Sequence, residues 1–161
     1  MKTFVAAVCA TIFVIPVVLA GQSMDALLQD FSRPLAGDGV SYTVIHLNDK
    51  TVEALFAQSP SKLAMRVQAR QNTMFYVQGT VEEDTEISIG FSVEQGGETI
   101  EGKALSMSNF EDGRELKPGD RLDGVVALGR KLNLSEPFTV ENDGESVLFD
   151  FPDDVVQEIA N

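Results

Sequence analysis

Hydrophobic and polar residues alternate along much of the chain after position 40. In Leu63–Arg70 and in Glu86–Glu94, every second residue is apolar and the residues between them are polar or small. A period of two with one polar face predicts half-buried strands of antiparallel sheets. The same reading predicts further strands at Val40–Leu47, Thr51–Ala57, Thr73–Val81, Thr99–Met107, Arg121–Leu128, Phe138–Glu141 and Ser146–Phe151.

The residues between these segments favour tight turns. Asn48-Asp49, Gln71-Asn72, Gly96-Gly97 and Asp143-Gly144 each separate two predicted strands. Residues of these types tolerate the positive φ that hairpin turns require. Pro118-Gly119 matches the two central positions of a type II turn. We therefore expect short strands joined by hairpins across residues 40–151.

This organisation indicates a mainly β fold. A parallel sheet needs crossover helices, and the predicted connections are too short to hold them. We expect an antiparallel β-sandwich, with a closed antiparallel β-barrel as the alternative.

Short helices are predicted at both ends of the domain. In residues 21–36 the apolar positions recur at the spacing of one helical face, with Ser23 as N-cap and Pro34 at the end. After Pro152, acidic residues favour the first turn of a second short helix over residues 152–160.

Residues 1–20 have the pattern of a secretory signal peptide. Lys2 precedes an apolar run, and the small residues Val18 and Ala20 stand at positions −3 and −1 before Gly21. The alternative is an uncleaved membrane anchor, but the apolar run is short for the hydrocarbon core of a bilayer. Cys9 would leave with this peptide, so residues 21–161 form a single β domain without cysteine. We expect export to the periplasm or the extracellular space.

The charge of the chain excludes some partners. It carries 25 acidic residues against 12 basic ones, of which Lys2 belongs to the predicted signal peptide. Such an excess of negative charge repels nucleic acid and acidic lipid surfaces. We therefore expect no nucleic-acid partner, and contact with a membrane only through the signal peptide before its cleavage.

One segment resembles a known class of domains. Leu116–Val126, with its Pro118-Gly119 turn, is followed by the apolar runs Phe138–Val140 and Val147–Phe149. Residues 115–151 thereby resemble immunoglobulin-like β-sandwich domains of bacterial exported proteins. The chain lacks the paired cysteines and the core tryptophan of antibody-type domains. The resemblance implies a sandwich but no activity and no site residues.

Few residues suggest nucleophilic or metal chemistry. His46 is the only histidine, so a metal site built from several histidines is excluded. We expect His46 at a sheet surface or rim, without a catalytic role. Ser59-Pro60-Ser61-Lys62 matches S-x-x-K formally. We interpret it as a turn between two strands, because the companion motifs of serine acyl-enzymes are missing.

Carboxylates are abundant but not arranged as a known site. Acidic residues cluster at 82–86 and 150–154, without the interleaved spacing of a calcium loop. We interpret both clusters as solvated loops. Asn133-Leu134-Ser135 is a glycosylation sequon, which matters only in a eukaryotic source.

We therefore predict no catalytic residue, no cofactor and no metal ligand. The function that this pattern favours is an exported, non-enzymatic binding or assembly module that acts through its β-sandwich surface. Its expected partner is another exported or envelope protein. One alternative is a small β-barrel that carries an apolar ligand, and a second is a carboxylate-dependent hydrolase.

Overall fold

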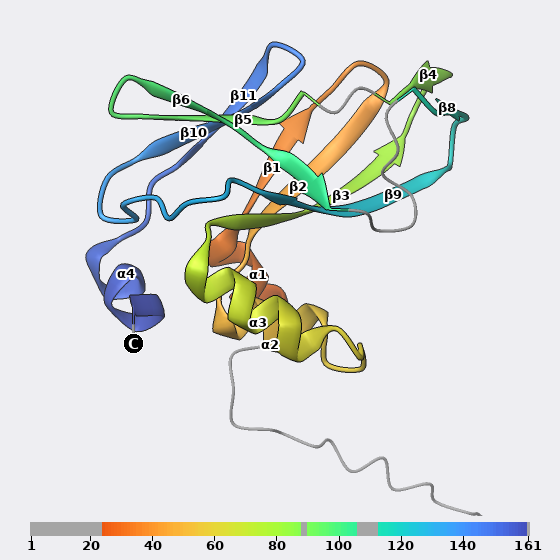
Figure 1. The fold of residues 1–161 in the computed structure, drawn as a ribbon. Helices are drawn as coiled ribbons and strands as arrows, with labels where there is room; N and C mark the ends of the chain where they lie inside the picture. The colour runs from red at the N-terminus through yellow and green to blue at the C-terminus, as the bar shows by residue number, and fades with distance from the viewer. Residues whose placement is uncertain (1–23, 88–89, 106–112, 161) are drawn as a thin grey trace, which may run out of the picture.

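The computed structural model describes residues 24–87, 90–105 and 113–160 (Figure 1). The predicted signal peptide, its cleavage site and the predicted N-cap Ser23 lie outside these residues.

The described residues form antiparallel sheets. The larger sheet has five strands in the order β1 (Ser32–Ala36), β2 (Val40–His46), β3 (Met74–Val81), β9 (Arg121–Ala127) and β7 (Lys103–Leu105). The second has four strands in the order β11 (Glu145–Phe149), β10 (Phe138–Asn142), β5 (Ser92–Gln95) and β6 (Glu98–Glu101). A two-stranded sheet pairs β4 (Thr85–Glu86) with β8 (Glu115–Leu116).

The five-stranded and four-stranded sheets share one apolar core. Phe75 of β3 contacts the rings of Phe138 and Phe149, which stack on each other with centroids 5.2 Å apart. Tyr42 of β2 packs edge-on against Phe91 beside β5. Burial of these aromatic side chains is the main favourable contribution to such a fold. The arrangement is mainly β, as predicted, and is consistent with a β-sandwich. Within the described residues the sheets remain separate and do not form a closed barrel.

The described part of the chain contains four short helices, which gather at one end of the sheets (Figure 1). They are α1 (Met24–Phe31), α2 (Asp49–Leu55), α3 (Lys62–Gln71) and α4 (Asp153–Ala160). The pair α2 and α3 covers the outer face of the larger sheet through a second apolar cluster. This cluster comprises Leu47, Val52, Phe56, Met65, Ala69, Met74 and Val125.

Several predicted elements are confirmed. Strands occur within or close to Val40–Leu47, Thr73–Val81, Arg121–Leu128, Phe138–Glu141 and Ser146–Phe151. Gly96-Gly97 and Asp143-Gly144 form the expected hairpin turns, and all four residues have positive φ. Gly119 also has positive φ, and Asp120 N donates to Lys117 O at 3.0 Å, as in a type II turn.

Two predicted strands are wrong, because Thr51–Ala57 and Leu63–Arg70 fall largely in helices α2 and α3. In α3 the buried positions are Met65 and Ala69, one turn apart, whereas Leu63 and Val67 are exposed. The segment is rich in Ala, Leu, Met, Arg and Gln, which are strong helix formers. Its apparent two-residue period is also compatible with a helix, because Met65 and Ala69 are four residues apart and so lie on one helical face.

Two predicted hairpin turns are also wrong. Asn48 is the N-cap of α2, and Asn72 is the C-cap of α3. Asn is favoured in turns and at helix ends for the same reason, since its side chain satisfies backbone groups that lack a partner.

Two more boundaries differ from the predictions. The N-terminal helix predicted over 21–36 ends at Phe31, and Ser32–Ala36 forms the edge strand β1, where Pro34 is tolerated. The strand predicted at Thr99–Met107 is split into β6 and β7, which belong to different sheets. The C-terminal helix α4 is confirmed.

Gly102 joins β6 to β7 where the chain passes from one sheet to the other. Gly102 N donates to Phe91 O at 2.8 Å. A Cβ at this position would lie 2.6 Å from Val126 Cγ1 and 2.9 Å from Phe91 O. The backbone oxygen cannot move without breaking the sheet, so the crossing requires glycine.

We expect Gly102→Ala to lower the free energy of unfolding by about 1 to 3 kcal/mol, the usual range for overpacking. Chemical denaturation measures the change. Gly90→Ala is the matched control, because its nearest contact would be an ordinary 3.4 Å. Equal stability of the two variants would contradict the steric argument.

Candidate functional site

A cleft of about 670 Å³ opens at the helical end of the molecule. Its walls come from the start of α2, the end of α3, the loop 131–135 and helix α4. We call it the helical-end cleft. Its lining includes Asn48, Lys50, Arg70, Lys131, Val156 and Ile159.

Asn48 positions the start of α2 at the cleft. Its Oδ1 accepts hydrogen bonds from Lys50 N at 2.9 Å and Thr51 N at 3.1 Å. Thr51 Oγ1 in turn accepts from Asn48 N at 2.9 Å, which completes a capping box. The Thr51 hydroxyl also lies 3.0 Å from His46 O and donates to it. The last residue of β2 and the first turn of α2 are therefore held together by one buried threonine.

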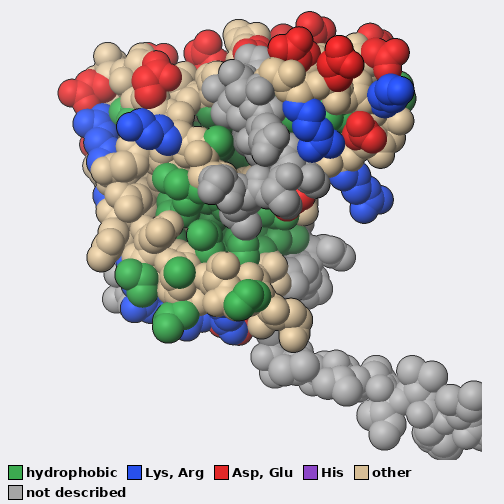
Figure 2. Space-filling model, turned by 45° about the vertical axis from the view of Figure 1, so that its right-hand side comes forward, with side chains coloured by type: hydrophobic (Ala, Val, Ile, Leu, Met, Phe, Trp, Pro, Cys, Tyr) green, Lys and Arg blue, Asp and Glu red, His purple; other side chains and the backbone are tan. Residues whose placement is uncertain are grey.

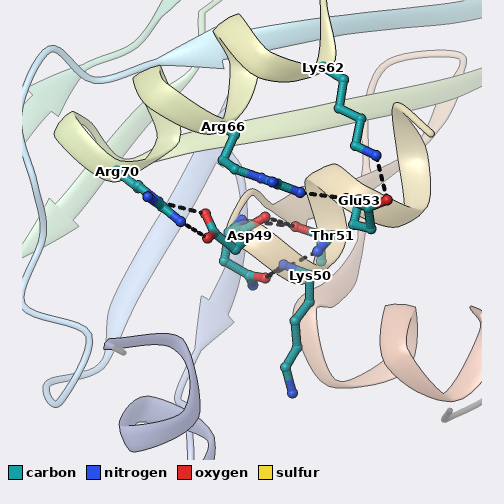
Figure 3. Close-up of polar contacts among 8 residues, drawn as sticks. Asp49, Lys50, Thr51, Glu53, Lys62, Arg66 and Arg70 are labelled. Atoms are coloured by element: carbon teal, nitrogen blue, oxygen red, sulfur yellow. Dashed lines mark hydrogen bonds and ion pairs between the residues drawn. The ribbon is translucent and has the colours of Figure 1, made fainter. Parts of the chain in front are cut away.

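Ion pairs connect α2 to the neighbouring helices (Figure 3). Arg70 Nε donates to Asp49 Oδ1 at 3.1 Å, and its terminal nitrogen pairs with the other carboxylate oxygen. Lys62 and Arg66 both pair with Glu53. Lys50 pairs with Glu158 of α4, across the cleft. Each such exposed pair contributes little to stability. The Asp49–Arg70 and Lys50–Glu158 pairs join residues that line the cleft.

The loop 131–135 is anchored to the sheets by two side chains. Buried Thr73 accepts a hydrogen bond from Leu132 N at its Oγ1, at 2.9 Å. Gln95 Oε1 accepts from Asn133 N at 3.0 Å, and Gln95 Nε2 donates to Asn133 O at 2.8 Å. This anchoring brings Lys131 to the end of α3, where its Nζ donates to Ala69 O at 2.6 Å.

Buried polar groups line a smaller hollow beside the cleft. This hollow, of about 40 Å³, shares Asn48 and Lys131 with the cleft and is also lined by His46. His46 is 2% exposed and Asn48 is 7% exposed. Within the described residues, His46 Nδ1 and Asn48 Nδ2 have no hydrogen-bond partner. Buried polar atoms are nearly always paired in native proteins, so these two atoms need an explanation.

The electrostatics of the hollow follow from burial and from Lys131. Burial, and secondarily the Lys131 charge, lowers the pKa of His46 to about 3. The imidazole is therefore neutral at physiological pH. Partial burial lowers the pKa of Lys131, and the nearby Asp49 carboxylate opposes this effect. The guanidinium of Arg70 holds the pKa of Asp49 below its usual value.

The lining of the cleft is mixed in character. Lys50, Arg70 and Lys131 bring positive charge to it. Val156 and Ile159 of α4, together with Leu132 and Leu134, bring apolar surface to the same cleft. Such a combination can hold a small molecule with a polar head and an apolar body.

The structure corrects the sequence-based placement of His46. It lies in the core, with its ring centroid 5.9 Å from that of Phe75 and 5.4 Å from that of Phe151. The sequence contained the signal for this burial. His46, Val44 and Tyr42 are alternate residues of β2, so their side chains point to the same, buried face of the sheet.

The other predicted features have simpler roles. Ser59-Pro60-Ser61-Lys62 connects two helices rather than two strands, and Lys62 pairs with Glu53. Within the described ranges, no three His, Cys, Asp or Glu side chains come together in a way that could hold a metal ion. None of the helices described is long and apolar enough to cross a lipid bilayer.

Sequence reasoning did not find the cleft. Its residues come from segments near positions 48, 70, 133 and 157, and no single segment has a recognisable motif. Comparison with family models, curated proteins and solved structures gives no significant match. The site is therefore interpreted from its own geometry.

We expect Asn48→Ala to lower the free energy of unfolding by about 1 to 2 kcal/mol, because it removes the acceptor that caps α2. Asn48→Asp is the matched control, since it keeps an acceptor oxygen and should cost clearly less. Thermal unfolding of both variants checks the difference. An Asp variant as unstable as the Ala variant would contradict the capping role.

Protonation of His46 should make the protein sensitive to acid. The unfolded state binds a proton at His46 near pH 6.5, whereas the folded state binds it only near pH 3. The free energy of unfolding should therefore fall as the pH drops below about 6.5, by roughly 2 to 3 kcal/mol between pH 7 and 4.5. The variant His46→Gln should lack this part of the slope. Denaturant titrations at several pH values measure it, and parallel profiles for the two proteins would refute the prediction.

Proposed function

We propose that the protein is an exported, non-enzymatic binding module that captures a small ligand in the helical-end cleft. The observation that carries the proposal is the pair of buried polar atoms, His46 Nδ1 and Asn48 Nδ2, whose residues line a small hollow that shares Asn48 and Lys131 with the open cleft. A ligand that hydrogen-bonds to them would offset the cost of their burial, which is about 1 to 3 kcal/mol for each group.

The charged groups at the cleft favour binding over catalysis. Asp49 and Glu158 are engaged in ion pairs with Arg70 and Lys50. An ionised carboxylate with a lowered pKa, as at Asp49, is a poor general acid. His46, with a pKa of about 3, is a weak base at neutral pH. These features argue against the carboxylate-dependent hydrolase.

The interior between the sheets gives less support to an apolar carrier. Phe75, Phe138 and Phe149 occupy it, with ring centroids 5.2 to 6.0 Å apart. Closely packed aromatic rings leave little room for a ligand between the sheets. The cleft lies outside this core.

Export and fold type remain predictions at this point. The support for export is the pattern of residues 1–20. The immunoglobulin-like type is supported by the Pro118-Gly119 turn before the buried strand β9. A partner among exported or envelope proteins remains a prediction as well.

Protein-detected NMR with a panel of small acids, bases, neutral polar and apolar compounds tests the binding function. We expect perturbed amide signals to concentrate at residues 69–70, 131–135 and 155–159. Ser135→Trp, which places a large side chain at the cleft, should abolish these perturbations. Ser146→Trp, on the exposed part of β11, is the control and should leave them unchanged. Perturbations confined to the sheets, or undiminished in Ser135→Trp, would refute the proposal.

A further inference from the structure

The charges around the helical-end cleft leave one cation without a carboxylate. Lys50 is paired with Glu158, and Arg70 is paired with Asp49. Lys131 donates to the Ala69 carbonyl and forms no ion pair within the described part of the chain. The cleft therefore presents one positive charge that is free to attract an anion.

This cation lies in an unusual position for such an acidic protein. The formal net charge of the chain is −13. Figure 2 shows many Asp and Glu side chains gathered along the top of the molecule, away from the helices α2 and α3 at the bottom. An anion near Lys131 is consequently separated from much of the negative surface that would repel it.

A second donor lies beside Lys131. Asn48 Oδ1 is used by the helix cap, so the Asn48 amide is oriented with its Nδ2 hydrogens free of the cap. Nδ2 is buried and unpartnered among the described residues, and Asn48 lines the same hollow as Lys131. An ammonium and an amide together offer donors to both oxygens of a carboxylate.

The balance of charge limits the anion to a single negative charge. Asp49 and Glu158 also line the cleft, and they would oppose a dianion such as a phosphate monoester. Arg70, the residue best suited to bind phosphate oxygens in a bidentate manner, already binds Asp49 in this way.

The apolar residues that line the cleft indicate the rest of the ligand. Val156 and Ile159 of α4 are half-buried, and Leu132 is 8% exposed. Covering this apolar surface with an aliphatic chain contributes roughly 25 cal/mol for each Å² removed from water. A bare small anion such as acetate would leave this surface uncovered.

We infer that the helical-end cleft binds an amphipathic monocarboxylate, with its head at Lys131 and Asn48 and its aliphatic body along α4. This inference rests on the proposed binding function and names the class of ligand. It requires no covalent step.

Calorimetric titration of the purified protein with four probes tests the inference. Octanoate should bind at least tenfold more tightly than octanamide, which lacks the negative charge. It should also bind at least tenfold more tightly than acetate, which lacks the aliphatic chain. Octylammonium should bind least, because its charge is opposite. Equal affinity for octanoate and octanamide would overturn the inference while leaving the binding function intact. Equal affinity for octanoate and acetate would overturn the part assigned to α4.

Variants assign the binding to the named residues. Lys131→Met should weaken octanoate binding at least tenfold, and Lys131→Arg should largely retain it. Lys117→Met, at an exposed lysine in the Pro118 turn, is the matched control and should change nothing. Asn48→Asp preserves the helix cap and replaces the amide donor by a negative charge, so it should weaken octanoate binding without unfolding the protein.

The outcomes separate the two proposals. Octanoate binding that survives in Lys131→Met and Asn48→Asp, with both variants folded, would overturn the assignment of the carboxylate head. Binding of neutral compounds at the cleft, without preference for carboxylates, would refute only the ligand class. If no compound of the NMR panel perturbed the cleft, the binding function itself would fail.

Discussion

The contact of Phe75 with the stacked rings of Phe138 and Phe149 holds the two main sheets together, and the position of the cleft depends on it. The His46 ring extends this aromatic cluster, because it packs against Phe75 and Phe151. The His46 carbonyl then accepts the Thr51 hydroxyl hydrogen bond that starts α2. The apolar core thus leads directly into the polar hollow beside the cleft.

The polar groups at this boundary are costly for stability. A neutral, fully buried imidazole and an unpaired amide reduce the free energy of unfolding relative to well-packed apolar side chains. Other buried polar residues, such as Thr73 and Thr51, are hydrogen-bonded. Of the three buried side-chain atoms without a partner in the described residues, His46 Nδ1 and Asn48 Nδ2 belong to the hollow beside the cleft, and the third is Arg66 Nε of α3. The presence of two such atoms at one hollow is what favours a binding role for the cleft over a purely structural one.

The helices α2 and α3 show why part of the secondary structure was misassigned from the sequence. The alternation in Leu63–Arg70 predicts a strand, but its two buried residues, Met65 and Ala69, are four apart, a spacing that also fits one face of a short helix. What decides for the helix is tertiary packing, since Met65 and Ala69 join Val52 and Met74 on the outer face of the larger sheet. Asn48 and Asn72 are equally ambiguous, because hairpin turns and helix ends favour the same residue.

The amino-acid pattern was sufficient for features whose physical cause is local. Runs of aromatic and β-branched residues around Phe75 and Val126 favour strands, and Gly96-Gly97 and Asp143-Gly144 favour turns through their tolerance of positive φ. The cleft is different, because it exists only where Asn48, Lys131 and Ile159 meet in space. The burial of His46 and the missing counter-ion of Lys131 depend on neighbours that are distant along the chain. Long-range packing therefore created the site, and no local pattern contained it.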